Sequence, residues 1–438
     1  MFQRCSKVLL NILLGLIFAT LAVTAEAGSL RAGAARVDIT PTPDEFPFTA
    51  EGTRPIAPYV GVHDPVYARA LFLDDGSTQV AILVVDVTAI PSPGKFLPAI
   101  AQAIGLPESN VFLAASHTHS VPLVNYHVDY PYQVGTTSPQ QAHEIDRLRD
   151  GAIEAARHAK ADLHPARVAF GRGVAWLNVN SSDPQGPSDK SLDVLRVEGT
   201  DGTPIALLVD YGVPSGLVSD NYRTEGGVQV SGDLFGAAAR MLEAQSPKGP
   251  VVLFASSSDG DQRSLISGNL PKVGSVPAGN AGEAQWVILD AVGRNLANAT
   301  LAVTGAMPQG TTEVKISASA KTVMCPGEHH DFDPKTGKPV FTDRGSVPIP
   351  LNLITINDIA LAGVGGNVYA EMGKKIKASS PLSQTTLIGG TSGSVGYILP
   401  DADFSAASHS LGGDPMKGGC AENGILQGLG EMMHAAKR

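Results

Sequence analysis

The stretch that decides the fold runs from Val111 to Ser120 and reads VFLAASHTHS. Its first half, Val111–Ala115, is an unbroken apolar run of the kind that forms a buried strand. Side chains on extended chain alternate between two faces, so His117 and His119 are expected to point the same way. Imidazole is a common metal ligand and a general acid or base near neutral pH. The stretch therefore predicts a functional histidine pair at a strand end; the alternative is two loop histidines held by hydrogen bonds.

The residues around this stretch predict an α/β fold. Gln79–Val87 is a β-branched run typical of a strand covered on both faces, Gly94–Gly105 reads as a helix, and Asn110–Ala115 is the next strand. That order indicates a parallel crossover unit. The two histidines follow the carboxyl end of its second strand, where α/β folds usually bind ligands. We expect a mixed, largely parallel β-sheet core flanked by helices.

The remaining elements are expected from periodicity and turn residues. Helices are predicted at Gln140–Lys160, Gly232–Ala244, Glu283–Ala299, Tyr369–Ala378 and Gly424–Ala436. Strands are predicted at Ala166–Trp176, Leu192–Tyr211 with a turn at Asp201-Gly202, Val251–Ala255, Thr312–Val323, and Leu353–Val364 with a turn at Asn357-Asp358. Cys325–Ser346 is expected to be a polar loop. Asp86 and Asp233 are expected to accept bonds from backbone N–H groups at a turn or helix start.

The N-terminus has the pattern of a secretory signal over residues 1–27. Arg4 and Lys7 precede the apolar run Val8–Ala22, and Ala25-Glu26-Ala27 supplies a small-x-small cleavage pattern. An uncleaved anchor is the alternative. No later segment of the sequence is long and apolar enough to span a bilayer. We therefore expect a secreted or periplasmic protein, with no transmembrane segment after cleavage.

The charge balance argues against a nucleic-acid partner. The chain has 32 basic and 42 acidic residues, and removing Arg4, Lys7 and Glu26 leaves 30 and 41, a formal net of −11. Such a surface repels phosphates and anionic membranes.

Two cysteines would remain after cleavage of the signal. Cys5 leaves with it, while Cys325 and Cys420 stay and could form one disulfide, as exported proteins often do. The bridge would close a loop of 420−325 = 95 residue steps. Chain entropy values such a loop at roughly 4–5 kcal/mol. Two free buried thiols are the alternative.

Several short segments, in a specific order, resemble the catalytic domain of the neutral ceramidase family of zinc-dependent amidases. They are Ala35–Pro41, Gly61–Leu71, Asn110–Ser120, Ser231–Ala238 against the family's "SGDFPGAA", Gly260–Gln262 against its "GAAGDQNP", Val395–Ile398 and Gly419–Glu422. The likeness extends from about Ala35 to the end of the chain. It implies a single ceramidase-like catalytic domain over 28–438, without the C-terminal β-sandwich of longer ceramidases.

The resemblance also implies a zinc site, but an incomplete one. In the family, zinc is held by the first histidine of HTH, a second histidine, a glutamate and a tyrosine. His117 matches the first ligand and His119 the substrate-facing histidine. The second histidine should fall in Asp210–Pro214, where there is none. Asn367 occupies the position of the glutamate, and Ser394 that of the tyrosine. A neutral amide is a poor substitute for a carboxylate on zinc.

The other family positions are partly kept. Tyr397 keeps the later of two tyrosines, Arg263 stands at the nucleophilic serine, and Asn180-Ser181 replaces an Asn-Arg pair. The predicted site is therefore catalytic His119, Tyr397 and Asp261, metal-binding His117, and substrate-binding Arg263 and Asn180. Zinc is the implied cofactor.

Other residues are candidates to complete the site. They are His63-Asp64, His127 with Asp129, Glu328-His329-His330-Asp331, and Asp210 as a replacement carboxylate. For His63-Asp64 the alternative is a structural turn, and for the Glu328–Asp331 cluster it is a solvated loop. The hydroxyls of Ser256–Ser258 could replace the missing nucleophile, although no GxSxG elbow surrounds them.

Two functions follow. The first is an exported hydrolase with altered chemistry that cleaves an amide or ester of a small or lipid-like substrate. The second is a catalytically silent relative that binds a ligand or partner in the old cleft.

Overall fold

The structure is a computed structural model that describes residues 28–48, 57–91, 93–123, 138–223, 225–245, 249–270, 279–333, 335–336, 339–404 and 416–437. The expected signal segment 1–27 lies outside these residues, as do His127 and Asp129. Among the described residues, no helix is long and apolar enough to cross a membrane.

The larger sheet has eight strands. Their order is β12 (Val251–Ser256), β10 (Pro204–Tyr211), β9 (Ser191–Gly199), β7 (His164–Val174), β2 (Arg31–Asp38), β4 (Tyr67–Asp74), β5 (Gln79–Val85) and β6 (Val111–Ala115). β5 and β6 are parallel and joined through helix α2 (Pro93–Ile104), which confirms the predicted crossover unit. β10 and β12 are also parallel.

The expectation of a largely parallel sheet is wrong. The other pairings of the eight-stranded sheet are all antiparallel. Two of these pairs, β4–β5 and β9–β10, are antiparallel because a short turn returns the chain directly to the neighbouring strand. Gly76 and Gly202 sit in these two turns with φ of +86° and +88°, a left-handed conformation that glycine adopts without steric cost. The fold is a mixed α/β structure.

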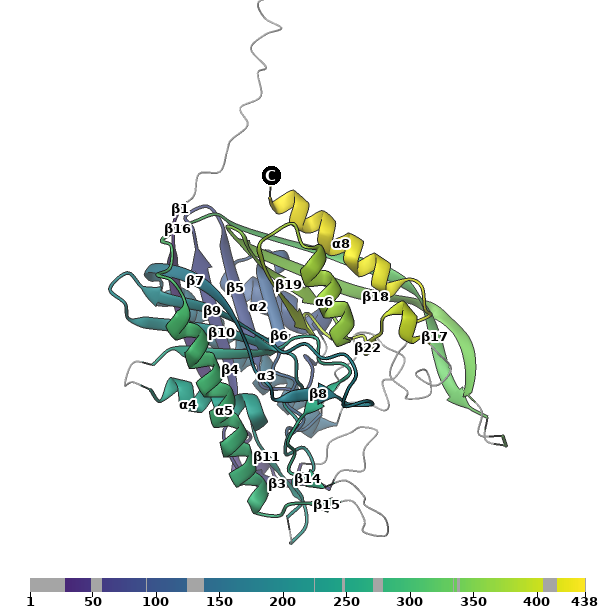
Figure 1. The fold of residues 1–438 in the computed structure, drawn as a ribbon. Coiled ribbons are helices and arrows are strands. Elements are labelled where there is room, and N and C mark those ends of the chain that lie inside the picture. Colours follow the sequence, from purple (N-terminus) through teal and green to yellow (C-terminus); the bar gives the residue numbers. More distant parts are fainter. Residues whose placement is uncertain are drawn as a thin grey trace, which may run out of the picture.

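A second sheet packs against the first. Its order is β17 (Ile316–Phe332), β18 (Pro339–Ile356), β19 (Ile359–Val364) and β21 (Gln384–Gly389). Helices α3 (Pro139–Ala161), α4 (Asp233–Glu243) and α5 (Ala284–Ala306) join α2 on the outer face of the large sheet, and α6 (Ala370–Ser379) and α8 (Ala421–Ala436) lie by the small one (Figure 1). The result is four layers: helices, sheet, sheet, helices.

The core follows from strand periodicity. Along β5, Ala81 and Leu83 face the helices, whereas Ile82 and Val84 pack between the two sheets. Both faces are buried, which explains why the sequence of this strand is continuously apolar.

Short elements complete the fold. They are β1 (Gly28–Ser29), β3 (Tyr59–Val62), β8 (Asn178–Asn180), β11 (Val228–Val230), β13 (Gln262–Ser264), β14 (Asn269–Leu270), β15 (Gly279–Asn280), β16 (Glu313–Val314), β20 (Asn367–Val368), β22 (Tyr397–Ile398), and 3-10 turns at Pro43–Glu45, Glu108–Asn110 and Asp401–Asp403.

The expectation of a polar loop over Cys325–Ser346 is also wrong. Most of this segment belongs to a long hairpin of β17 and β18, which are paired from Ile316↔Ile356 to Phe332↔Pro339. Pro326 lies on an edge strand at a register shift, where a missing N–H costs little. The predicted disulfide is confirmed, since Cys325 and Cys420 are bonded with their Cα atoms 5.7 Å apart. It ties this hairpin to the start of α8.

Candidate active site

The two histidines of the HTH stretch come together just beyond the carboxyl end of β6. Their ring centroids are 4.9 Å apart and the rings are tilted by 56°. The route differs from the predicted extended chain, because His117 has a left-handed φ of 58°. Backbone bonds hold this conformation: His119 N donates to Ser215 O at 2.9 Å, and Ser215 N donates to His117 O at 3.1 Å.

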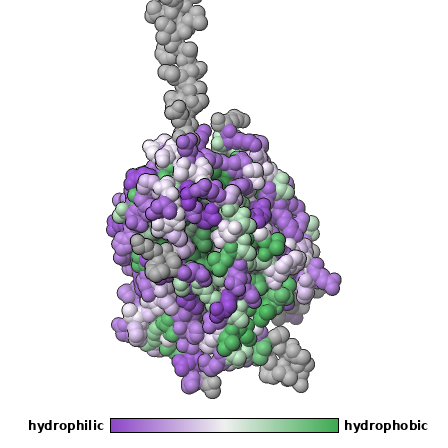
Figure 2. Space-filling model, turned by 60° about the vertical axis from the view of Figure 1, so that its left-hand side comes forward, coloured by the Kyte–Doolittle hydropathy of each residue, from purple (hydrophilic) through white to green (hydrophobic). Residues whose placement is uncertain are grey.

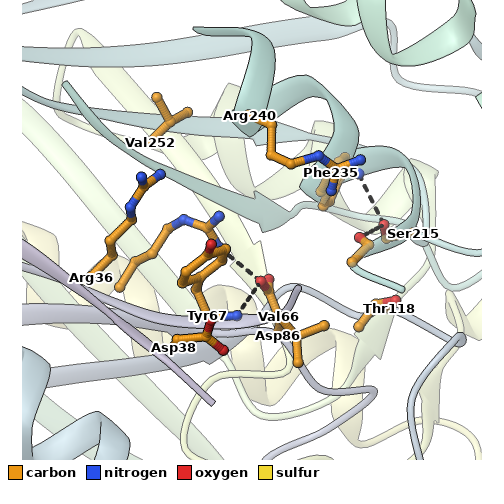
Figure 3. A network of polar contacts seen from close by, with 12 residues as sticks. Arg36, Asp38, Val66, Tyr67, Asp86, Thr118, Ser215, Phe235, Arg240 and Val252 are labelled. Atoms are coloured by element: carbon orange, nitrogen blue, oxygen red, sulfur yellow. Dashed lines mark hydrogen bonds and ion pairs between the residues drawn. The ribbon is translucent and has the colours of Figure 1, made fainter. Parts of the chain in front are cut away.

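The N-terminus of α4 packs against the HTH segment and the adjoining Ser215. The Ser215 hydroxyl accepts a bond from Phe235 N at 3.0 Å (Figure 3). Thr118 forms a backbone bridge to Ser215. The Ser120 hydroxyl donates to the fully buried Asp233 at 2.8 Å. Asp233 also accepts from the backbone N–H groups of Leu217, Val218 and Leu234, which confirms its predicted structural role. Burial raises the pKa of Asp233 above its usual value.

Asp86 has a similar structural role. It accepts from Tyr67 N at 2.9 Å (Figure 3). It also accepts from the buried Arg69 guanidinium at 2.8 Å. The backbone bond confirms the expectation for this residue, and the ion pair with Arg69 adds to it.

His63 and Asp64 form a second histidine–carboxylate pair, in which Nδ1 lies 2.8 Å from Oδ2. The His63 ring stacks on Trp286 with 3.6 Å between the ring centroids. Asp64 accepts from the Ser231 hydroxyl at 2.6 Å and from Arg240 at 2.6 Å. Ser231 in turn donates its N–H to Ser120 O at 2.8 Å. The pair is thus connected to the HTH segment through Ser231.

A buried carboxylate, that of Asp259, contacts the histidine pair. Its Oδ2 lies 2.5 Å from His117 Nδ1, and the Ser256 hydroxyl contacts the same oxygen. Burial alone would lower the pKa of His117, but the charge of Asp259 and the hydrogen bond outweigh it and raise that pKa. Sequence reasoning missed this residue. The available signal was its place in the turn, since Asp259 stands where the family motif "GAAGDQNP" has its second alanine before the GD.

Asp261 and Asn180 lie side by side and are largely occupied by structural bonds. Asp261 accepts from Ala370 N, the first residue of α6, at 2.8 Å and from the Asn180 amide at 2.8 Å. Asn180 also donates to Pro187 O at 3.2 Å. Burial raises the pKa of Asp261. These contacts place both residues in the support of the turn; a catalytic or substrate-binding role for them stays a prediction.

Tyr397 lies on the other side of this turn. It is paired through its backbone with Asn367, and its ring meets the Tyr369 ring edge-on at 6.3 Å. Gly260 fits tightly here, because a Cβ on it would lie only 2.3 Å from Asn367 O. Tyr397 is 38% exposed, as a substrate-facing donor would need to be. Arg263, on β13, is exposed and donates to Ser264 O at 3.2 Å.

The donor set in the described part of the chain does not fit a zinc ion held by several ligands. Among the described residues, no group of three or more His, Cys, Asp or Glu side chains could hold a metal. Asp210 lies between the two sheets with its carboxylate 2.5 Å from the Thr386 hydroxyl. Burial and the neighbouring Asp193 raise its pKa well above the usual range. The Glu328–Asp331 cluster lies in the hairpin strand β17 rather than in a loop.

Comparison with known proteins agrees with this fold. No family model matches the chain. A neutral ceramidase from Mycobacterium tuberculosis is 30% identical over 151 residues, which cover 32% of this chain and 23% of that protein. Neutral ceramidase B of Dictyostelium discoideum is 26% identical over 234 residues, covering 47% of this chain and 32% of the relative. The aligned parts therefore span about a third or less of the curated relatives.

Solved structures match over more of the chain. The neutral ceramidase from Pseudomonas aeruginosa superposes with a TM-score of 0.71 at 16% identity, covering 93% of this chain and 74% of that one. A ceramidase complexed with C2 gives a TM-score of 0.72 at 16% identity, with 93% and 75% covered. The fold is therefore that of the neutral ceramidases. The sequence matches add a distant similarity to neutral ceramidases over a third to a half of the chain.

Proposed function

We propose that the protein is an exported hydrolase that cleaves an ester or amide bond of a lipid-like substrate. The observation that carries the proposal is the pairing of His117 and His119, 4.9 Å apart, beyond the carboxyl end of β6. His119 acts on the substrate as acid or base, and His117 is a metal ligand or an orienting group. Tyr397 donates a hydrogen bond to the developing oxyanion, and Arg263 and Asn180 contribute to substrate binding.

The surface beside the site supports a lipid-like substrate. Trp176 is 69% exposed, and Leu265 and Ile266 are also exposed. Leu265 N donates to Leu177 O, so these apolar residues adjoin each other on the segments that flank β8 and β13. On the face seen in Figure 2, hydrophobic residues gather in patches between hydrophilic ones. The disulfide supports export to an oxidising compartment.

Esters are expected to be better substrates than amides. Amide cleavage needs strong stabilisation of the tetrahedral oxyanion. Asn367, Ser394 and Arg263 stand where the family has a zinc carboxylate, a zinc tyrosine and a nucleophilic serine. Loss of one oxyanion donor can cost roughly a hundredfold to a thousandfold in rate. Ceramide hydrolysis should therefore be weak or absent.

The test is a panel of fluorogenic long-chain esters and N-acyl amides assayed with the wild type, His119→Ala and the control His164→Ala. We expect ester turnover that His119→Ala abolishes and His164→Ala preserves. Full activity in His119→Ala would reject the assigned role, and rapid ceramide turnover would show that other residues rebuild the family site. No turnover on any substrate, with retained binding of the same lipids, would favour the silent binding protein instead.

A further inference from the structure

The pairing of Asp259 with His117 has a chemical consequence beyond the family's site. The Asp259 side chain is only 1% exposed. Its Oδ2 accepts hydrogen bonds from His117 Nδ1 and from the Ser256 hydroxyl. The Ser256 oxygen also lies 2.9 Å from Val213 O. The carboxylate is therefore fixed in place by groups on two strand ends. A buried carboxylate held this way fixes the tautomer and orientation of the imidazole it contacts.

The orientation of the His117 ring leaves one of its two nitrogens to act on a substrate or to bind a ligand. Because Nδ1 of His117 faces Asp259, Nε2 is the nitrogen available to a substrate, a water molecule or a metal. Metal-bound histidines often have such a carboxylate partner too. The surrounding positions favour a histidine that acts without a metal over one that binds a metal. Asn367 and Ser394 replace two family ligands, and no group of three metal-binding side chains occurs among the described residues.

We propose that Asp259 and His117 form a metal-independent acid–base pair that replaces the family's zinc in activating water. The inference rests on the proposed hydrolase function and applies to esters of lipid-like acids. His117 Nε2 takes a proton from water as the oxygen bonds to the carbonyl carbon, and the carbonyl electron pair moves to its oxygen. Collapse of this intermediate reforms the carbonyl and breaks the ester C–O bond. The leaving oxygen takes a proton from His119. The products are a carboxylic acid and an alcohol, and proton exchange with solvent returns both histidines to their starting states.

In this scheme Asp259 is a positioning residue, since it acts through His117 and does not touch the substrate. Asp259→Asn keeps the shape of the side chain but removes the charge that favours the Nδ1–H tautomer. We expect kcat on the ester substrate to fall about a hundredfold or more, the scale of general-base catalysis, while KM stays nearly constant. The matched control is Asp75→Asn, another buried aspartate bonded to backbone N–H groups, at the turn before β5. It should leave both constants unchanged.

Two measurements test the pair without relying on turnover. A proton NMR spectrum of the full-length folded protein should show a strongly downfield resonance from the His117–Asp259 hydrogen bond. The signal should vanish in Asp259→Ala and His117→Asn and persist in Asp75→Asn. Elemental analysis of protein purified without chelator should find far less than one zinc per chain, and added zinc should not raise the melting temperature.

The outcomes separate this inference from the proposed function. Ester turnover that resists chelator but is lost in Asp259→Asn would support both. Turnover that chelator abolishes and zinc restores, or stoichiometric zinc that His117→Asn releases, would overturn the metal-independent pair and leave the hydrolase intact. Full activity in Asp259→Asn, or absence of the downfield signal, would also overturn the pair. An inactive wild type that keeps the signal would reject the hydrolase alone.

Discussion

Replacing Asp64 with alanine should destabilise the protein substantially. This carboxylate accepts from Ser231 Oγ, Gly232 N and Arg240 Nη1 at 2.6, 2.9 and 2.6 Å, besides its contact with His63. Removing one partner of a buried ion pair typically costs 3–5 kcal/mol. Arg240 is 30% exposed, so water can solvate it after the change. We therefore expect a loss of about 2–4 kcal/mol in the free energy of unfolding.

The pH dependence of this loss has a definite sign. Burial by itself raises the pKa of Asp64, but the bonds and charges of His63, Arg240, Ser231 and Gly232 outweigh it and lower that pKa below its usual value. A lowered folded-state pKa means that the stabilisation is present above the unfolded-state value, about 3.9, and disappears as pH falls through the folded-state value. The difference between wild type and Asp64→Ala should therefore be largest near neutral pH and shrink in acid.

Urea unfolding followed by circular dichroism measures both effects. The control is Asp150→Ala, which removes only a surface partner of Arg149 and should change stability by less than about 0.5 kcal/mol. Asp64→Ala should also lower ester hydrolysis, because Ser231 connects Asp64 to the HTH segment. Wild-type stability in Asp64→Ala at neutral pH would refute the role of this carboxylate as an anchor of the site.

Three further changes have expected outcomes. Asp210→Asn should stabilise the protein near neutral pH and lose that advantage in acid. Because the folded-state pKa of Asp210 is raised, its carboxyl costs stability as pH rises above the unfolded-state pKa, about 3.9; urea midpoints across pH check this. Cys325→Ser should lower stability by roughly 4–5 kcal/mol in the chain-entropy model, and reductant should have the same effect on the wild type only. Gly373→Ala should cost about 1–3 kcal/mol, since its Cβ would lie 2.3 Å from Ser258 Oγ. The control Gly430→Ala meets nothing within 4 Å and should be stabilising by about 0.5–1 kcal/mol.

Strongly periodic segments were predictable because their pattern is set by burial. The apolar run of β5 and the helical spacing of α3 were recognisable from sequence, since a strand buried on both faces and a helix buried on one leave different spacings. The direction of neighbouring strands was not predictable from sequence, because a parallel and an antiparallel neighbour bury the same side chains. The β17–β18 hairpin was missed since its glycines and prolines are typical of loops, yet Pro326 and Gly327 sit at a register shift, where pairing is relaxed.

The candidate site was predictable only where the sequence kept a family motif. His117 and His119 were found by their spacing, and the structure brings them together. Asp259 was not found from the sequence, because its partner His117 is 142 residues away and no local pattern encodes that contact. The two aspartates flanking Gly260 look equivalent in sequence. Only the fold shows that one meets His117 and the other caps α6.

The most direct test of the central claim is a crystal structure with a non-hydrolysable long-chain alkyl phosphonate, which mimics the tetrahedral intermediate of ester cleavage. We expect the phosphonate oxygens to lie within hydrogen-bond distance of His117 Nε2, His119 and Tyr397, and the alkyl chain to run toward Trp176 and Leu265. A phosphonate bound away from the histidine pair, under conditions in which it inhibits turnover, would show that these residues are not the catalytic site.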